Sequence, residues 1–346
     1  MTATPATPTT PIPCTLLRGD GIGPEIVDAT LQVLDALGAP FAWHEQIAGL
    51  TAIERDGDPL PQATIDSMRT TGLTLKGPLT TPIGGGFRSI NVRLREALKL
   101  YANVRPARSL LPDGKFPDVD IVLIRENTGG FYVGVEHFIQ IGDDPHAVAE
   151  ASGILTRENC QKIARYAFEY AVATGRKKIT VVHKANILKA LTGLFLETVT
   201  TIGKEYEGRV KLEDRIVDNC AMQLVINPAQ FDMILTTNMF GDILSDEIAG
   251  LIGGLGLAPG ANVGANAAMF EAVHGSAPDI AGQGIANPTA LLLAAAMMLE
   301  HCSLHALAAQ LRTALARTLA DKATRTRDLG GPLLTADYTR AVIANL

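Results

Sequence analysis

The sequence predicts an α/β fold in which helices cover both faces of a central sheet. Three segments carry this prediction, because each is an apolar run that ends in polar residues: DIVLIREN (120–127), KKITVVHKAN (177–186) and FDMILTTNMFGD (231–242). Continuous apolar runs are typical of strands buried on both faces, and a segment with helical spacing, 158–175, lies between the first two. Ligands of such sheets bind beyond the carboxyl ends of the strands. The polar residues that end these runs are therefore expected in a site.

Length, charge and composition narrow the class of protein. A chain of 346 residues exceeds one simple core, so two domains are expected. The hydrophobic content of 47% indicates a folded chain. The net charge of −6 and the aromatic content of 5% argue against a nucleic-acid binder, which needs a basic footprint and, for single strands, stacking surfaces.

The cysteines and the apolar segments predict a cytoplasmic protein. No two cysteines form a C-x-x-C pair, so a zinc site is not expected and the thiols are interpreted as buried and reduced. The four are Cys14, Cys160, Cys220 and Cys302. Residues 1–14 are rich in Thr and Pro and lack the features of a signal peptide, which predicts a disordered tail. The longest apolar run, 288–299, is too short to span a bilayer and predicts a buried helix.

The first hundred residues predict two strands and two helices. A strand at 14–18, a loop at 19–25 and a helix opened by Pro24 form one strand–loop–helix unit. The glycines of the loop are spaced G-x-G-x-G, so the dinucleotide fingerprint G-x-G-x-x-G is absent and the loop has no assigned role. A second strand is predicted at 71–79 and an amphipathic helix at 89–101.

Arginines in and after the amphipathic helix predict a site for a small polyanion. Ser89 is a favoured N-cap residue, and Asn91 and Arg95 are four residues apart and share a helix face. A helix N-terminus offers free N–H groups and a partial positive charge to an anion. These residues predict a carboxylate-binding corner, to which Arg105 and Arg125 add forked donors.

Not every arginine of this stretch is assigned to the site. The competing interpretation is a solvated surface charge, which is preferred for Arg88 and Arg93. The site interpretation is preferred for Arg95, Arg105 and Arg125.

Two carboxylates in NMFGDILSDEIAG (238–250) are candidates for a divalent metal site. Asp242 and Asp246 are one helical turn apart, and close carboxylates repel unless a cation or a proton lies between them. Ligand sets made only of oxygen favour Mg²⁺ or Mn²⁺, and Asp218 is a third candidate ligand. By spacing alone, an ordinary acidic helix face that includes Glu247 is the preferred interpretation.

Two further residues are candidates for proton transfer. Lys184 follows a predicted strand, and a nearby divalent ion would lower its pKa towards the range that suits proton transfer. Taken alone, this lysine is an ordinary surface residue. Tyr132 is a candidate proton donor, and its alternative is a half-buried core tyrosine.

The long loop at 270–288 predicts a nucleotide site, because a loop of this length needs a function. It contains His274, the backbone N–H groups from Gly275 to Ala277, and Asp279. A carboxylate at this place can accept both hydroxyls of a ribose, and it would repel a 2′-phosphate. The loop is therefore expected to favour NAD.

Together, these segments resemble the isocitrate and isopropylmalate dehydrogenase family of β-decarboxylating dehydrogenases. The resemblance runs from GDGIGPEI to TRDLGG (326–331), nearly the whole chain, and its most specific motifs are NMFGDILSDEIAGLIGGLG and EAVHGSAPDIAGQGIANP. It implies the two-domain fold of that family, with a central sheet flanked by helices and a dimer clasp. In this family the small glycine loop is not a dinucleotide fingerprint.

The resemblance implies a role for each candidate residue. The carboxylate clamp is Arg95, Arg105 and Arg125, and the residues that hold the extra carboxylate of isocitrate are Ser89 and Asn91. The proton-transfer residues are Tyr132, Lys184 and Asp218. The metal ligands are Asp218, Asp242 and Asp246. The cofactor-binding residues are Glu271, His274, Gly275, Ser276, Ala277, Asp279, Ile280 and Asn287.

The resemblance also implies the division of the chain into domains. A large cofactor-binding domain is expected at 15–100 and 253–346, and a small domain for dimerisation, metal and substrate at 101–252. The clasp, where two chains interlock, is expected at 130–157. The glycine-rich segment 250–269 is the hinge candidate.

A homodimer with a shared active site is implied as well. Lys184 and Asp218 would then come from the partner chain. NADP-dependent relatives carry a Lys-Tyr pair where this sequence has Asp279 and Ile280, so the resemblance and the ribose argument agree on NAD.

The implied reaction is the NAD-dependent oxidation and decarboxylation of isocitrate to 2-oxoglutarate and CO₂, with Mg²⁺ or Mn²⁺. Homoisocitrate is an alternative substrate, because the resemblance associates further arginines in this region, such as Arg88, with homoisocitrate enzymes. The further alternatives are 3-isopropylmalate, malate and tartrate. Outside catalysis, the alternatives are a regulatory subunit of a hetero-oligomeric dehydrogenase and a polyanion-binding protein without chemistry.

Overall fold

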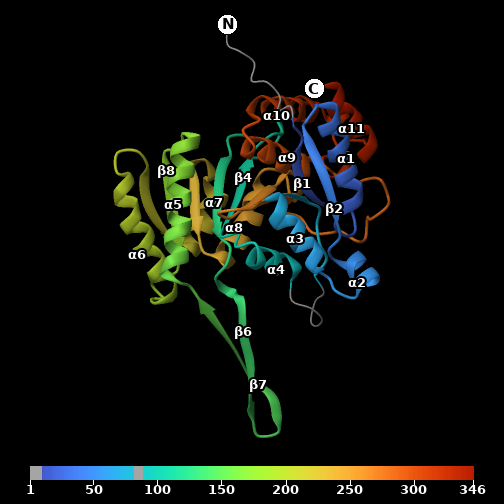
Figure 1. Ribbon diagram of the computed structural model, residues 1–346. Helices are drawn as coiled ribbons and strands as arrows, with labels where there is room; N and C mark the ends of the chain where they lie inside the picture. Colours follow the sequence, from blue (N-terminus) through green and yellow to red (C-terminus); the bar gives the residue numbers. More distant parts are fainter. Residues whose placement is uncertain (1–9, 82–88) are drawn as a thin grey trace. The chain divides into compact units, whose positions relative to one another are not determined.

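The computed structural model describes residues 10–81 and 89–346, and these residues group into two compact units. The first unit contains the described residues of Met1–Lys99, Ala107–Pro117 and Ala249–Leu346. The second unit contains Leu100–Pro106 and Asp118–Ile248. Each unit is a sheet with helices packed against it, which confirms the predicted α/β class (Figure 1).

The strands of the first unit form a mostly parallel sheet. Their bounds are β1 Ile12–Leu17, β2 Phe41–Gln46, β3 Leu73–Lys76, β11 Pro259–Val263 and β12 Ala268–Ala272. The order is β2-β1-β3-β12-β11, in which only the β11–β12 pair is antiparallel. β3 and β12 are buried along their whole length, as expected for apolar strands covered on both faces.

The helices of the first unit pack around this sheet. They are α1 Gly23–Ala36, α2 Leu50–Asp56, α3 Gln62–Thr71, α4 Ile90–Ala97, α9 Thr289–His301, α10 His305–Ala320 and α11 Thr335–Ala344. α1 has a proline in its first turn, where the missing N–H costs nothing. α9 is buried from Thr289 to Leu299, because its sequence is apolar on every side. This confirms the buried helix predicted at 288–299.

The strands of the second unit have the order β4-β5-β10-β8-β9, in which β5, β10, β8 and β9 run parallel. The bounds are β4 Ala102–Arg108, β5 Asp120–Glu126, β8 Lys178–His183, β9 Lys211–Ile216 and β10 Met233–Thr236. The helices are α5 Arg157–Thr174, α6 Leu191–Gly203, α7 Val217–Ile226 and α8 Asn238–Leu251, and a 3-10 turn, η1, spans Lys204–Tyr206. The predicted apolar runs are thus strands, and their polar ends lie at the carboxyl edge of the sheet.

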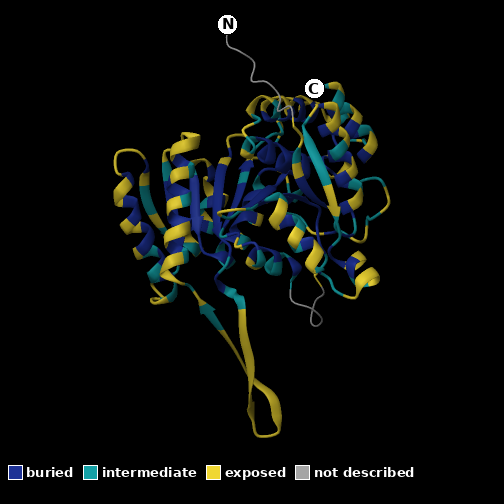
Figure 2. Cartoon of the chain, in the orientation of Figure 1, coloured by how far each residue is buried: buried dark blue, intermediate teal, exposed yellow. Residues whose placement is uncertain are grey.

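A two-stranded hairpin projects from the second unit (Figure 1). It pairs β6 (Gly130–Ile141) with β7 (Asp144–Ile154) in antiparallel fashion. Most of the hairpin is exposed, and it carries exposed apolar side chains such as Phe138 and Ile141 (Figure 2). A single chain leaves this apolar surface uncovered.

The start of the chain differs from the prediction. β1 begins at Ile12, so residues 12–14 belong to a strand and not to the tail predicted at 1–14. The reason is parallel pairing with β2, which starts at the Ile12–Phe41 pair. Residues 1–9 of that tail lie outside the described residues. β2, α2 and α3 were not predicted.

The helix predicted at 89–101 is shorter in the structure. α4 ends at Ala97, and Lys99 has a left-handed φ of 52° that stops it. Tyr101 therefore lies outside the helix, just before β4, where its ring meets Tyr166 edge to face at 6.1 Å. Contacts with the rest of the second unit override the local helical pattern here.

The predicted small domain, 101–252, is interrupted. Residues 107–117 group with the first unit. Asp113 in this segment forms ion pairs with Lys322 and Arg325, each at 2.8 Å. These two cations lower the pKa of the Asp113 carboxyl to about 2. The carboxylate is therefore held by the first unit.

Two further expectations concern the membrane and the thiols. Within residues 10–81 and 89–346, no helix is long and apolar enough to span a membrane.

All four cysteines are free thiols, and only Cys302 is not fully buried. Burial raises the pKa of Cys160 to about 11 and that of Cys220 to about 12, so these thiols are inert at neutral pH.

Candidate active site

The carboxylates of Asp242 and Asp246 lie on α8, and one arginine from β4 reaches both. Arg105 Nη1 is 3.2 Å from Asp242 Oδ1 and 3.7 Å from Asp246 Oδ1. The buried guanidinium of Arg105 also donates hydrogen bonds to Asn103 Oδ1 at 3.1 Å and to Ser245 Oγ at 2.5 Å. These bonds hold the arginine in one orientation towards the carboxylates.

A second arginine, Arg125 near the end of β5, points at the same carboxylate. Its side chain is 1% exposed, and Nε and Nη2 donate to Asn238 Oδ1 at 2.9 and 2.7 Å. Its Nη1 forms an ion pair with Asp242. Gly241 makes room for this side chain, since a Cβ there would lie 2.6 Å from Arg125 Cγ.

Tyr132 from β6 completes a cluster of predicted residues. Its hydroxyl donates a hydrogen bond to Asp242 Oδ2. The guanidinium of Arg125 lies 5.1 Å from the centre of the tyrosine ring, which is a cation–π contact. The structure thus brings Tyr132 and the two predicted clamp arginines of the second unit, Arg105 and Arg125, to the carboxylate of Asp242.

The donor set of Asp242 and Asp246 fits a hard divalent cation. Burial raises the pKa of the Asp246 carboxyl and Asp242 raises it further, while Arg105 and Arg125 oppose this shift. A cation between two such carboxylates would relieve their repulsion. Among the described residues, no group of three or more His, Cys, Asp or Glu side chains is arranged to hold a metal ion. One chain therefore offers two carboxylates here and needs further ligands.

Asp218, the third predicted metal ligand, is paired with Lys184. Lys184 follows β8 and Asp218 is in the first turn of α7, and Lys184 Nζ forms an ion pair with Asp218 Oδ1. The hydrogen bond from Lys184 lowers the pKa of the Asp218 carboxyl. The side chain of Asp218 is 69% exposed, so the pair is accessible to another chain.

His183, which precedes Lys184, was not singled out in the sequence. The ring is buried, and its Nδ1 accepts a hydrogen bond from the backbone N–H of Ala185 at 3.0 Å. In the neutral ring the proton is then on Nε2, which donates to Asp214 Oδ2 at 3.1 Å. These bonds hold the turn that presents Lys184. The sequence feature that could have identified His183 is its position at the polar end of an apolar strand.

The predicted carboxylate corner on α4 belongs to the first unit. Ser89 occupies the N-cap position, as predicted, and its side chain makes no capping hydrogen bond. Asn91 Oδ1 is buried and has no hydrogen-bond partner within residues 10–81 and 89–346. Arg95 is 7% exposed and lies 3.7 Å from Glu271.

The arginines that were interpreted as surface charges are Arg88 and Arg93. Arg88 lies outside the described residues. The side chain of Arg93 is 35% exposed and forms an ion pair with Asp58 at 3.5 Å, which agrees with a surface role.

Glu271, a predicted cofactor residue, is the centre of a buried charge network. Lys76 Nζ lies 2.8 Å from one of its oxygens, and Asn262 Nδ2 donates to the other at 2.7 Å. Burial raises the pKa of Glu271, but the charges of Lys76 and Arg95 outweigh this effect and bring it to about 2. Lys76 was missed in the sequence, although it is a polar residue at the carboxyl end of a buried strand.

The glycine loop at 19–25 supports the predicted cofactor loop. The N–H of Ile22 donates to Ser276 O at 2.9 Å, and a Cβ on Gly21 would lie 2.0 Å from that same oxygen. Only glycine permits this approach. Glu25 accepts hydrogen bonds from Gly284 N at 3.3 Å and Ala286 N at 2.9 Å. The loop that had no assigned role thus holds the 270–288 segment at Ser276, Gly284 and Ala286.

The remaining cofactor candidates are spread along the same loop. His274 Nδ1 lies 2.9 Å from Gly275 O, and burial lowers the pKa of this histidine. Ala277 has a positive φ of 39°, and Asp279 is exposed beside Ile280. Asn287 Nδ2 donates to Asp328 Oδ2 at 2.9 Å, while its carbonyl accepts from the N–H of Thr289. Asn287 therefore fastens the end of the loop to α9 in this structure.

Comparisons with known proteins identify the family of the chain. The model of the isocitrate/isopropylmalate dehydrogenase family matches residues 13–342. The chain is 46% identical over 341 residues to isocitrate dehydrogenase [NAD] catalytic subunit 5, mitochondrial, of Arabidopsis thaliana, which covers 98% of this chain and 89% of the relative. It is 45% identical over 335 residues to the isocitrate/homoisocitrate dehydrogenase of Thermus thermophilus, which covers 96% of this chain and 97% of the relative.

A solved structure supports the same assignment. The crystal structure of isocitrate dehydrogenase from Methylococcus capsulatus superposes with a TM-score of 0.93 at 53% sequence identity, covering 96% of this chain and 98% of that one. The motifs, the fold and the cluster around Asp242 lead to one conclusion. The chain belongs to the isocitrate/isopropylmalate dehydrogenase family.

Proposed function

We propose that this protein oxidises and decarboxylates isocitrate to 2-oxoglutarate and CO₂ while reducing NAD⁺, with the help of a divalent metal ion. The observation that carries the proposal is the cluster in which Arg105, Arg125 and Tyr132 meet the carboxylates of Asp242 and Asp246. A substrate with several carboxylates needs such fixed cations. The name of a relative at 46% identity, an NAD isocitrate dehydrogenase, supports the proposal.

The choice of isocitrate rests on the start of α4. The extra carboxylate of isocitrate needs hydrogen-bond donors in addition to the arginines, and Ser89 and Asn91 are the proposed donors. The amide of Asn91 has a buried atom without a partner among the described residues. Because amide nitrogen and oxygen exchange places by rotation, this side chain can turn a donor to a ligand. The Thermus thermophilus relative is named for isocitrate and homoisocitrate, so homoisocitrate is the second candidate.

The proposed metal ligands are Asp242, Asp246 and Asp218 of a second subunit. When bound, the ion supplies Lewis-acid polarisation of the hydroxyl and carboxyl oxygens of the substrate. Lys184 and Asp218, already joined by an ion pair, form the proposed base that takes the proton of the substrate hydroxyl. Tyr132 is the proposed acid that protonates the carbon from which CO₂ leaves, and its hydroxyl already donates to the cluster. Arg95, Arg105 and Arg125 hold the carboxylates in place.

The proposed cofactor is NAD⁺, which supplies the hydride acceptor. Asp279 is exposed on the cofactor loop, where its carboxylate can accept the two ribose hydroxyls. The same negative charge would repel the 2′-phosphate of NADP⁺. The backbone of Ser276 is held by Ile22 of the glycine loop and its hydroxyl by Thr80, which favours a loop that is ordered before the cofactor binds.

A homodimer is part of the proposal. The second unit exposes apolar side chains on the hairpin and on α7 and α8. They include Phe138, Ile141, Met222, Val225, Ile226 and Ile243. An uncovered apolar surface of this kind marks an interface, and a second copy would bring the missing ligand Asp218. The cytoplasmic location stays a prediction, since the Arabidopsis relative is named as mitochondrial.

One assay tests the proposal. The purified chain is supplied with isocitrate and either NAD⁺ or NADP⁺, with and without Mg²⁺, and absorbance at the reduced nicotinamide band is followed. Metal-dependent reduction of NAD⁺ is expected, with isocitrate the best of a panel that contains homoisocitrate, 3-isopropylmalate, malate and tartrate. A better rate with any other acid of the panel would overturn the choice of substrate, and an inactive chain would favour a regulatory subunit.

A further inference from the structure

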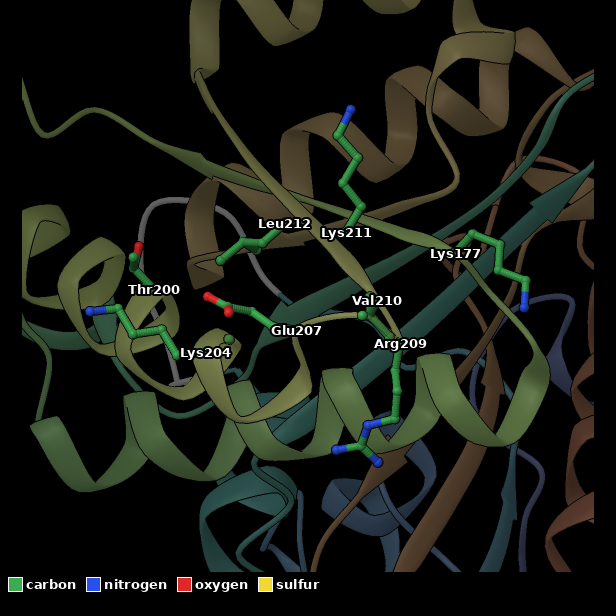
Figure 3. A pocket seen from close by; sticks show the side chains of 10 residues that line it. Lys177, Thr200, Lys204, Glu207, Arg209, Val210, Lys211 and Leu212 are labelled. Atoms are coloured by element: carbon green, nitrogen blue, oxygen red, sulfur yellow. The ribbon is translucent and has the colours of Figure 1, made fainter.

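A basic pocket opens at the starts of β8 and β9 in the second unit. It has a volume of about 600 Å³. Figure 3 shows that its lining side chains come from the end of α6, the loop before β9 and the residues that begin the two strands. Lys184 and Asp218 follow the other ends of the same parallel strands. Because a six-residue strand spans about 20 Å, the pocket is distinct from the proposed site of proton transfer.

Positive charge dominates the lining of this pocket. Lys177, Lys204, Arg209 and Lys211 contribute cations, and Glu207 is the one acidic residue among the lining side chains. Like charges gathered around one cavity repel each other and focus a positive potential into it. An anion in the pocket would relieve this repulsion.

Two carboxylates close to the pocket, those of Glu205 and Glu213, are held by other partners. Glu205 accepts two hydrogen bonds from Arg165, at 2.8 and 2.9 Å. Glu213 on β9 is 3.1 Å from Lys178. Among the residues that the structure describes, no carboxylate lies within ion-pair distance of the ammonium groups of Lys177, Lys204 or Lys211. These charges are available to a ligand.

The backbone joins the starts of the two strands, and a ring holds the guanidinium of Arg209 in place. The N–H of Lys211 donates to Lys177 O at 2.8 Å, which joins the starts of the two strands. The guanidinium of Arg209 stacks over the ring of Tyr206 at 4.7 Å, and its Nη2 donates to Glu205 O at 3.0 Å. A ligand would therefore meet one cation, Arg209, whose side chain is already held, beside lysines that extend from a fixed backbone.

An apolar wall lies beside the charges. Gly203 packs so closely that a Cβ there would lie 2.7 Å from Leu212 Cδ2 and 3.1 Å from Phe168 Cζ. Val210 and Leu212 also line the cavity. In Figure 3 the charged ends of the side chains spread around the pocket and do not meet at one point. A volume of about 600 Å³ exceeds the needs of a single phosphate and lies in the range of pockets for small organic ligands.

We propose that this pocket binds a phosphate ester that carries at least two negative charges and a ring. The cations at Lys177, Lys204 and Lys211 would hold the charged groups, and the wall at Gly203 and Leu212 would cover the ring. The proposal does not depend on the identity of the substrate. It predicts a binding site in addition to any site that the reaction uses.

The test measures binding of ADP and of inorganic pyrophosphate by calorimetry. The full chain is first saturated with NADH, so that ADP does not enter the cofactor site. Wild type is compared with Lys204→Gln/Lys211→Gln, and with Lys99→Gln/Lys115→Gln, which removes two exposed charges from the first unit. ADP is expected to bind wild type and the control equally, and to bind the pocket variant at least tenfold more weakly.

The two ligands separate the parts of the proposal. Tighter binding of ADP than of pyrophosphate supports a ring on the apolar wall, and equal binding overturns that part. No binding to wild type, or unchanged binding to the pocket variant, overturns the site itself. The unfolding curve of each variant, followed by far-ultraviolet circular dichroism of the whole chain, shows that both units are folded.

Discussion

Lys76 Nζ lies 2.8 Å from a carboxylate oxygen of Glu271, and the two side chains are 1% and 9% exposed. The pair exists because β3 and β12 are parallel neighbours whose register places Glu271 opposite Lys76. Arg95 reaches the same carboxylate from α4. Within the first unit, a residue of the predicted carboxylate clamp and a residue of the predicted cofactor site therefore share one buried charge network.

Removing one member of this network should destabilise the first unit. Lys76→Met leaves the Glu271 carboxylate buried with only Arg95 as a cationic partner, and loss of one partner of a buried pair costs about 3–5 kcal/mol. Urea unfolding followed by the fluorescence of Trp43, the single tryptophan, reports on this unit.

A double variant serves as the control for this prediction. Lys76→Met/Glu271→Gln removes both charges of the pair and keeps a neutral acceptor beside Arg95, so it should recover most of the loss. If the single variant unfolds at the urea concentration of wild type, the pair does not stabilise the unit.

The same network should make stability depend on acid pH. The pKa of Glu271 in the folded chain is about 2, below the ordinary value of 4.5. A group whose pKa is lowered by folding contributes stability above its unfolded pKa, and this contribution is lost as pH falls through its folded pKa. Wild type should therefore lose stability between pH 5 and pH 2 more steeply than Glu271→Gln, as measured by urea unfolding of Trp43 fluorescence. Equal slopes would mean that Glu271 is not held in its charged form.

The strands could be predicted from the sequence because apolar runs with polar ends are local signals. β5, β8 and β10 lie where the runs predicted them. The carboxylates of Asp242 and Asp246 could be placed on one helix face for the same reason, since spacing along a helix determines which residues share a face.

The features that could not be predicted from the sequence depend on contacts between segments that are far apart in the chain. The pairing of Lys76 with Glu271 follows from the register of two strands, and no local pattern shows which strands pair. The early end of α4 could not be predicted either, because the helical pattern of the sequence continues past Ala97 while the chain turns to enter β4. The role of Glu25 in anchoring the cofactor loop needs the fold as well.

The choice of cofactor should depend on one exposed carboxylate. Asp279→Ser removes the acceptor for the ribose hydroxyls and the charge that repels a 2′-phosphate. We expect the ratio of kcat/KM for NAD⁺ over NADP⁺ to fall at least about tenfold, which corresponds to about 1.4 kcal/mol. Asp279→Glu keeps the charge and should change the ratio less. If the serine variant keeps the ratio of wild type, Asp279 does not select the cofactor.

The last prediction tests whether two chains share each active site. Lys184→Met and Asp242→Asn should each be inactive as pure proteins, because general acid–base catalysis contributes about 10²–10⁴ in rate and loss of a metal ligand removes the ion. If Lys184 acts in the site of the partner, a mixed dimer contains one site with both changes and one site with neither. Random reassortment of a two-fold dimer should then restore about a quarter of wild-type activity.

The mixing experiment has a matched control in the same pair of chains. A chain that carries both Lys184→Met and Asp242→Asn contributes a changed residue to both sites of any dimer. Mixing it with either single variant should therefore restore no activity. Activity is measured after the mixture is dissociated in mild urea and dialysed. If the two single variants stay inactive after reassortment while wild type treated in the same way recovers, Lys184 and Asp242 act within one chain. In that case the ion pair between Lys184 and Asp218 would have to serve the site of its own subunit.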